Sequence, residues 1–171
     1  MNNRPDRIRK TMMKEIGDIL LNLRFVFEKI GQKIFLAGIA AFLTGHILYL
    51  VAIIPISKSL WICVAAGAVL AAIILALIFK AFDVKLAFKI FGVLYIGAVV
   101  IMTAIAIGNC ITSGFAPFQS AYAVGAVLFT ASDLVLIINT FGTKTTFALR
   151  ITNLSLYYVG QLLIATSLFL I

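Results

Sequence analysis

Five long apolar segments, separated by short polar connections, occupy most of the chain. They cover about residues 34–54, 60–79, 86–107, 119–139 and 151–171. Each is close to the roughly 20 residues that an α-helix needs to cross the hydrocarbon core of a membrane. Turn-forming residues stand in the connections, at Pro55, Gly114, Pro117 and Gly142. The pattern predicts an all-α fold, a polytopic bundle of five transmembrane helices.

The first 33 residues are basic and differ from the apolar segments. Residues 12–30 place apolar side chains on one helical stripe, with charges elsewhere: Ile16, Ile19, Leu20, Leu23, Phe27 and Ile30. Such a stripe predicts an interfacial or partial helix, which lies on the membrane surface or packs against the bundle. We therefore expect a cytoplasmic leader over residues 1–33 and a transmembrane helical domain over residues 34–171.

Composition agrees with a membrane protein. The 171 residues are 63% hydrophobic and 12% charged, with a formal net charge of +8, and the mean hydropathy is +1.16. A soluble domain contains about 25% charged residues. In a soluble protein the basic excess would suggest nucleic acid, but these basic residues lie before and between the apolar segments. That distribution is a signal of membrane topology, so no nucleic-acid partner is expected.

The basic residues gather on one side of the predicted bundle. Eight lie in the leader, and five lie in the second and fourth connections: Lys80, Lys85, Lys89, Lys144 and Arg150. The other side has Lys58 alone. Because basic residues favour the cytoplasmic side, we expect a multi-pass protein of the cell membrane with its amino terminus in the cytoplasm and its carboxyl terminus outside.

Asp133 stands beside Ser132 in the middle of the fourth apolar segment. A carboxylate at this depth costs about 2.5–3.5 kcal/mol on membrane-insertion scales, so such residues usually face a cavity and have a function. Lys and Arg are absent from the middle of every apolar segment, so none is placed to neutralise the charge. The pair is the first candidate for a functional site.

Other polar side chains lie at comparable depth. His46 and Tyr49 are one turn apart in the first segment. In the fifth segment three residues follow i, i+4 steps and share a face: Asn153, Tyr157 and Gln161. Asp18, in the leader, lies on the same predicted side of the membrane. We expect these residues to line one cavity that opens toward the inner leaflet.

Structural interpretations of the same residues stay open at this stage. His46 and Gln161 also suit interhelical hydrogen bonds, and His46 is a possible partner for Asp133. Tyr157 also suits packing or an interfacial anchor, and Tyr95 is interpreted as a core residue. Basic residues such as Lys89, Lys144 and Arg150 either mark topology or contact a lipid phosphate.

The sequence lacks the residues that several common kinds of catalytic site need. One histidine cannot form a multi-histidine zinc site, and Cys63 and Cys110 have no metal-binding spacing, which favours two buried thiols. The sequence has no G-x-S-x-G elbow, no Walker sequence and no dinucleotide fingerprint. We expect no metal and no cofactor. The chemistry that remains possible is acid–base catalysis by carboxyl groups in a membrane cavity.

Four blocks of the sequence resemble the YhhN family of lysoplasmalogenase-like membrane proteins. They are IGDIL at 16–20, GIAAFLTGHILY at 38–49, GAVLFTASD at 125–133 and YYVGQLLI at 157–164. The blocks occur in the family's order and cover about residues 16–165. Family members usually have a complete apolar span before the Gly-Asp, so the resemblance implies a chain that is shortened at its amino terminus.

The resemblance implies hydrolysis of the vinyl ether bond of lysoplasmalogens, which releases a fatty aldehyde and glycerophospho-ethanolamine or -choline. Acid opening of a vinyl ether needs a proton on carbon and gives an oxocarbenium-like cation that water captures. A carboxyl group that stays protonated away from water can donate the proton, and an ionised one can stabilise the cation. The site residues expected from the resemblance are catalytic Asp18, Asp133 and His46, and substrate-binding Ser132, Tyr49, Tyr157 and Gln161.

The expected partners are therefore a lysophospholipid substrate and membrane lipids, with the oligomeric state left open. Two other functions fit the same residues. One is a non-catalytic lipid-binding or small transport protein in which Asp133 couples proton movement. The other is a shortened relative that folds and has lost activity. Aldehyde release, or uptake that depends on a pH gradient, distinguishes them.

Overall fold

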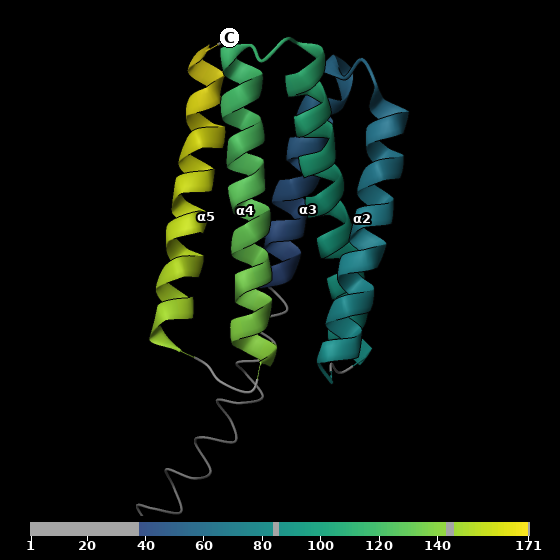
Figure 1. The fold of residues 1–171 in the computed structure, drawn as a ribbon, viewed down its shortest axis with the longest axis vertical. Helices are drawn as coiled ribbons and strands as arrows, with labels where there is room; N and C mark the ends of the chain where they lie inside the picture. Colours follow the sequence, from purple (N-terminus) through teal and green to yellow (C-terminus); the bar gives the residue numbers. More distant parts are fainter. Residues whose placement is uncertain (1–37, 84–85, 143–145, 171) are drawn as a thin grey trace, which may run out of the picture. The chain divides into compact units, whose positions relative to one another are not determined.

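The computed structural model describes residues 38–83, 86–142 and 146–170. These residues are almost entirely helical (Figure 1). Those from Ala40 onward form the helical bundle of the unit Ala40–Ile171. The first described helix covers Gly38–Ile56 and ends in the short helix η1, Ile54–Ile56. The other elements are α2 (Leu60–Ala81), α3 (Leu86–Thr112), α4 (Pro117–Phe141), α5 (Phe147–Ser167) and η2 (Leu168–Leu170). The predicted all-α helical bundle is confirmed.

Four helices within the described ranges are long and apolar enough to cross a membrane: the first described helix, α2, α3 and α4. Large apolar side chains, among them Trp61, Leu70 and Leu77, are exposed at the surface of the bundle, as expected where lipid is the solvent. The chain is therefore a multi-pass membrane protein. The predicted helix over residues 12–30 lies outside the described residues.

The fifth predicted segment forms a helix, but its composition differs from that of the other four. Helix α5 is 21 residues long, which is enough to span the hydrocarbon. It is not among the helices that are apolar enough to be recognised as spans, because polar residues such as Asn153, Tyr157 and Gln161 recur along it. Its crossing of the membrane stays a prediction.

The ends of the helices follow from the predicted turn residues. Pro117 occupies the first turn of α4, where its missing N–H leaves no partner unsatisfied. Gly114 takes a positive φ of 69° in the connection before it, and the Phe115 N–H donates to Cys110 O at 2.9 Å, which ends α3. The backbone N–H of Gly142 caps the end of α4 by donating to Ile138 O.

Helix α3 is longer than the apolar segment that predicted it. The segment ends near residue 107, but the helix continues to Thr112. Asn109 is buried in this extension, and its Nδ2 donates to Ile53 O at 3.3 Å, near the end of the first described helix. The hydrogen bond gives a polar side chain a partner inside the bundle, so the helix does not have to end before it.

Helices α4 and α5 pack through a contact between two glycines. A Cβ atom on Gly125 would lie 2.8 Å from Gly160 O, and one on Gly160 would lie 2.9 Å from Gly125 O. Only residues without a side chain allow this approach, which is a common way for membrane helices to associate. The contact holds α5 against α4 and sets the face that α5 turns toward the bundle.

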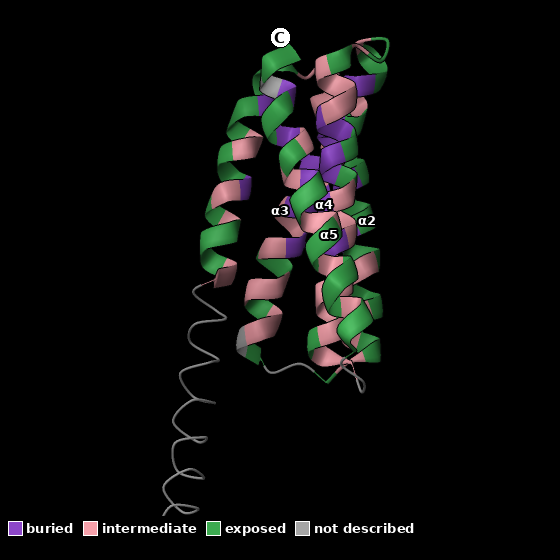
Figure 2. Cartoon of the chain, turned by 90° about the vertical axis from the view of Figure 1, so that its left-hand side faces the viewer, coloured by how far each residue is buried: buried purple, intermediate pink, exposed green. Residues whose placement is uncertain are grey.

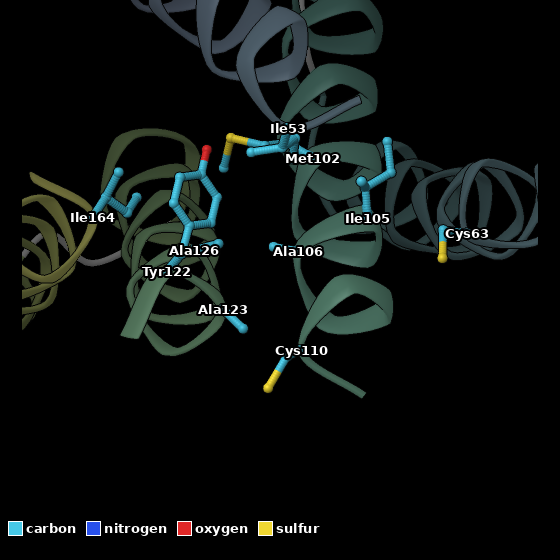
Figure 3. Close-up of a cluster of buried hydrophobic side chains, with 10 residues drawn as sticks. All are labelled: Ile53, Cys63, Met102, Ile105, Ala106, Cys110, Tyr122, Ala123, Ala126 and Ile164. Atoms are coloured by element: carbon cyan, nitrogen blue, oxygen red, sulfur yellow. The ribbon is translucent and has the colours of Figure 1, made fainter. Parts of the chain in front are cut away.

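Burial is uneven along the bundle. We call the end where α2 and α4 finish and where α3 and α5 begin the basic end, because Lys80, Lys89 and Arg150 lie there. Figure 2 shows that the buried residues gather in the other half, which contains the carboxyl-terminal end of α5. Ten of them form the cluster in Figure 3, which includes the free thiols of Cys63 and Cys110. The predicted pair of buried thiols is confirmed.

Candidate functional site

Asp133 lies inside the bundle, in the middle of α4. Its side chain is only 4% exposed. The Tyr95 hydroxyl, on α3, donates a hydrogen bond of 2.8 Å to Asp133 Oδ2. A buried carboxyl group without a partner would be costly, and this bond provides one from a neighbouring helix. Asp133 therefore faces other helices and not the surrounding lipid.

His46 is fully buried in the first described helix and lies beside Tyr95. Its ring centroid is 5.5 Å from that of Tyr95 and 4.7 Å from that of Phe129. Its Nδ1 lies 2.7 Å from Phe42 O. Because a carbonyl oxygen only accepts, Nδ1 must carry the hydrogen, and in a neutral ring Nε2 is then an acceptor. Nε2 is buried and has no hydrogen-bond partner among the described residues.

Helix α5 contributes a row of polar side chains to the same region. The Tyr49 hydroxyl donates to Gln161 Oε1 at 3.1 Å, which joins the first described helix to α5. Tyr157, one turn before Gln161, packs its ring against Phe42 and Phe129, with centroid distances of 5.8 and 5.5 Å. The shared face predicted for these two residues does point into the bundle, and Gln161 forms the interhelical hydrogen bond considered for it.

Ser132 connects α4 to α5. Asn153 Nδ2 donates to Ser132 O at 2.8 Å and to Ser132 Oγ at 3.2 Å. The sequence analysis expects Ser132 to bind substrate, and in the structure its hydrogen-bond partner is the side-chain amide of Asn153 on α5. Ser132 and Asn153 thus fix the rotation of α4 that turns the adjacent Asp133 toward α3.

We call the side chains that meet here the polar cluster: His46, Tyr49, Tyr95, Ser132, Asp133, Asn153, Tyr157 and Gln161. They come from four helices that are far apart in the sequence. The proposed pairing of His46 with Asp133 is not the one found, since their hydrogen bonds run to Phe42 and Tyr95. Asp18 and Lys144 lie outside the described residues. A common cavity that opens toward the inner leaflet stays a prediction.

Tyr95 is the member of the cluster that the sequence analysis missed. A lone tyrosine in an apolar helix resembles a core residue, and nothing near it in the sequence is polar. The signal that was available in the sequence is the depth of Tyr95, because Tyr95 and Asp133 lie at similar distances from the ends of their helices. Tyr95 lies nine residues after the start of α3, and Asp133 lies eight residues before the end of α4. Both helix ends are at the basic end, so both side chains lie about 12–14 Å from it.

The kinds of side chain in the polar cluster limit what it can bind. Over the residues that the structure describes, no group of three or more His, Cys, Asp or Glu side chains is placed to hold a metal ion. The described cluster instead offers one carboxyl group, one imidazole, three phenol hydroxyls and several amide or hydroxyl groups. Such a set can transfer protons and orient a polar part of a lipid.

The comparisons with known proteins bear on the same residues. The sequence matches the YhhN family over residues 12–168. Comparisons with curated proteins and with solved structures found no match. The matched region contains the whole polar cluster and both glycines of the α4–α5 contact. The chain belongs to the YhhN family, which includes lysoplasmalogenases.

Proposed function

We propose that the protein hydrolyses the vinyl ether bond of a lysoplasmalogen, with Asp133 as one of two catalytic carboxyl groups. The observation that carries the proposal is the position of Asp133. It is buried in a helix that is long and apolar enough to span the membrane, and Tyr95 orients it. The Tyr95 ring also packs against the imidazole of His46. Family membership supports the same reaction, because the family includes lysoplasmalogenases.

The reaction consumes one water molecule and needs no redox step. A carboxyl O–H gives its proton to the vinyl carbon farther from the ether oxygen, and the π electrons of the double bond form the new C–H bond. The other vinyl carbon becomes an oxocarbenium ion. Water adds to it and loses a proton to a base, which gives a hemiacetal. The hemiacetal hydroxyl then gives up its proton as its oxygen forms the carbonyl bond. The bond to the glycerol oxygen breaks, that oxygen takes up a proton, and a fatty aldehyde is released.

The polar cluster supplies groups for each of these steps. Because Tyr95 donates to Oδ2, the transferable proton of a protonated Asp133 would lie on Oδ1. A second carboxylate would stabilise the cation, and we propose Asp18 for that group because it stands in the sequence block at 16–20 that resembles the family. Either carboxyl group can take either role. Charge stabilisation is strong in a site that excludes water.

His46 suits the water-capture step. Its Nδ1–H is engaged with Phe42 O, so Nε2 is the nitrogen that can accept a proton from water. Tyr49 packs against the His46 ring and donates to Gln161. Together with Tyr157, these residues would orient water or the glycerol backbone. Ser132 would act through Asp133, by holding α4 in its rotation with Asn153.

The experiment is aldehyde release from lysoplasmenylethanolamine by purified protein in phospholipid nanodiscs. We expect equal amounts of fatty aldehyde and glycerophosphoethanolamine from the wild-type protein. An acyl lysophosphatidylethanolamine should give no product, because an ester has no vinyl carbon to protonate. Loss of the general acid typically costs a factor of about 10²–10⁴ in rate, so Asp133→Asn should lower aldehyde release at least ~100-fold.

The two other functions give different results in the same preparation. A proton-coupled carrier would release no aldehyde, and in vesicles it would show uptake that depends on a pH gradient and on Asp133. An inactive relative would show neither signal, although it would be folded. Full activity in the Asp133→Asn variant would refute the assignment of Asp133 even if the protein were a hydrolase.

A further inference from the structure

An apolar groove runs between α2 and α4 at the basic end of the bundle. Its volume is about 340 Å³. Four residues near the end of α2, the following Phe82 and three residues of α4 line it: Ile74, Leu77, Ile78, Ala81, Phe82, Leu134, Ile137 and Ile138. On α2 the lining follows helical steps of three and four residues, so one stripe of each helix forms each wall.

The groove is open at the surface of the bundle, and its inner wall packs against a core that Tyr95 also contacts. Leu77 is 62% exposed and Ile138 is 46% exposed, so the outer part of the groove faces lipid. At the inner part, Ile74 and Ile137 pack against a small buried core, and Tyr95 packs against the same core. The inner end of the groove and Tyr95 therefore contact the same buried core, and Ile137 lies one turn from Asp133 on α4.

Two lysines lie near the end of α2 where the groove opens. Lys80 precedes the lining residue Ala81 in the last turn of α2 and is exposed. Lys89, on α3, places its Nζ 5.8 Å from the ring centroid of Phe79, which holds it against the end of α2. Asp83 is the one acidic residue in the described part of this end. Flexible lysine side chains near a membrane surface attract phosphate groups.

The length of the groove matches a glycerophospholipid that lies with its phosphate at the lysines. From Ala81 to Ile74 the rise along α2 is about 10 Å. A few covalent bonds separate the phosphate of such a lipid from the bond that joins its chain to glycerol. That bond would lie at the inner end of the groove, level with Tyr95 and Asp133, and the chain would continue from there toward the middle of the membrane.

We propose that this groove binds a single-chain glycerophospholipid, with the phosphate at Lys80 and Lys89 and the start of the hydrocarbon chain between α2 and α4. The volume lies near the lower end of the range of about 300–1,000 Å³ for ligand pockets, which suits one chain. The inference rests on the proposed function for its link to Asp133, since the groove would present the ether bond to the polar cluster. Binding itself does not need the reaction.

Photocrosslinking tests the proposal on the full-length protein in phosphatidylcholine nanodiscs. The probe is lysophosphatidylethanolamine with a diazirine near the start of its acyl chain, which the proposed hydrolysis cannot cleave. We expect crosslinks to concentrate on the ends of α2 and α4, at groove residues such as Leu77, Ile78, Leu134 and Ile138. Unlabelled lysophosphatidylethanolamine should displace the probe, and diacyl phosphatidylethanolamine should not.

Two pairs of variants give matched controls. Ile138→Trp fills the groove and should lower crosslinking at least ~10-fold, whereas Val124→Trp, at a similarly exposed position elsewhere on α4, should leave it unchanged. Lys80→Gln combined with Lys89→Gln should weaken displacement by the phosphate-bearing competitor at least ~3-fold. Lys58→Gln, at the opposite end, should have no effect.

Three results would overturn the proposal: crosslinks spread evenly over the exposed apolar residues, equal displacement by the diacyl lipid, or full binding by Ile138→Trp. The first needs only the wild-type protein, so it decides the matter even if a variant fails to fold. Specific binding without aldehyde release would contradict the proposed function but would still support lipid binding in the groove. Undiminished hydrolysis by a folded Ile138→Trp variant would contradict lipid binding in the groove but would still support the proposed function.

Discussion

The hydrogen bond from Tyr95 to Asp133 determines what the carboxyl group can do. At 2.8 Å it engages Oδ2, so the Tyr95 ring, which also packs against His46, fixes the direction of the remaining oxygen. A buried carboxyl group with one strong donor has fewer orientations than one in water. We regard Tyr95 as a positioning residue, because it acts on the substrate through Asp133.

Tyr95→Phe tests this role with a nearly isosteric change. A hydrogen bond to a charged group contributes about 1.5–3 kcal/mol, which corresponds to a factor of about 10–100 in rate. We expect kcat for lysoplasmalogen hydrolysis to fall by this factor, with KM within about twofold and a displaced pH–rate profile. Tyr158→Phe is the control, since Tyr158 is 65% exposed on α5. An equal loss of kcat in both variants would contradict the positioning role of Tyr95.

At the scale of helices, the α4–α5 contact positions one side of the polar cluster. Gly125 and Gly160 let the two backbones approach, and the Asn153–Ser132 bond fixes their rotation. Both glycines belong to the sequence blocks that resemble the YhhN family. Their place in those blocks thus has a structural reason, since a side chain at either position would push α5 away from α4.

Gly160→Ala should therefore destabilise the protein. A methyl group there would lie 2.9 Å from Gly125 O and 3.0 Å from Phe129 N, and overpacking of this kind costs about 1–3 kcal/mol. Gly97→Ala, on α3, would meet no atom within 4 Å and should gain up to about 1 kcal/mol of helix propensity. Thermal unfolding in detergent should show a lower midpoint for Gly160→Ala only. A stabilised Gly160→Ala variant would contradict the tight contact.

The sequence predicts the helices well because each apolar segment has the length of a membrane span. It predicts α5 as a helix but overstates how apolar it is, since Asn153, Tyr157 and Gln161 are polar side chains that are only partly buried. The site is harder to predict. Tyr95 looks like a core residue until the rotation of α3 is known, and that rotation depends on contacts with two other helices. Apolar periodicity on α3 does not specify it.

For the whole molecule, the uneven burial has a consequence for function. The buried residues gather in the half of the bundle away from the basic end (Figure 2). The groove lies in the basic half. The polar cluster lies between the two. A lipid that reaches Asp133 from the basic end would come from the leaflet at that end, which the charge distribution predicts to be the cytoplasmic one.

Single cysteines test this topology with a membrane-impermeant maleimide on intact cells. We expect Lys58→Cys and Phe169→Cys to label from outside, and Asp83→Cys and Thr146→Cys to label only after permeabilisation. The wild-type protein is the control, because Cys63 and Cys110 are buried. Labelling of Phe169→Cys only after permeabilisation would show that α5 does not cross the membrane.

The claim on which the account depends is that Asp133 takes part in protonating a vinyl carbon. Hydrolysis of lysoplasmenylethanolamine in ²H₂O, with rapid reduction of the aldehyde to the alcohol before mass spectrometry, tests it directly. The wild-type protein should give a product with one deuterium on the carbon next to the former carbonyl, and Asp133→Asn should give at least ~100-fold less of it. Product without deuterium, or product formed at the wild-type rate by Asp133→Asn, would contradict the account.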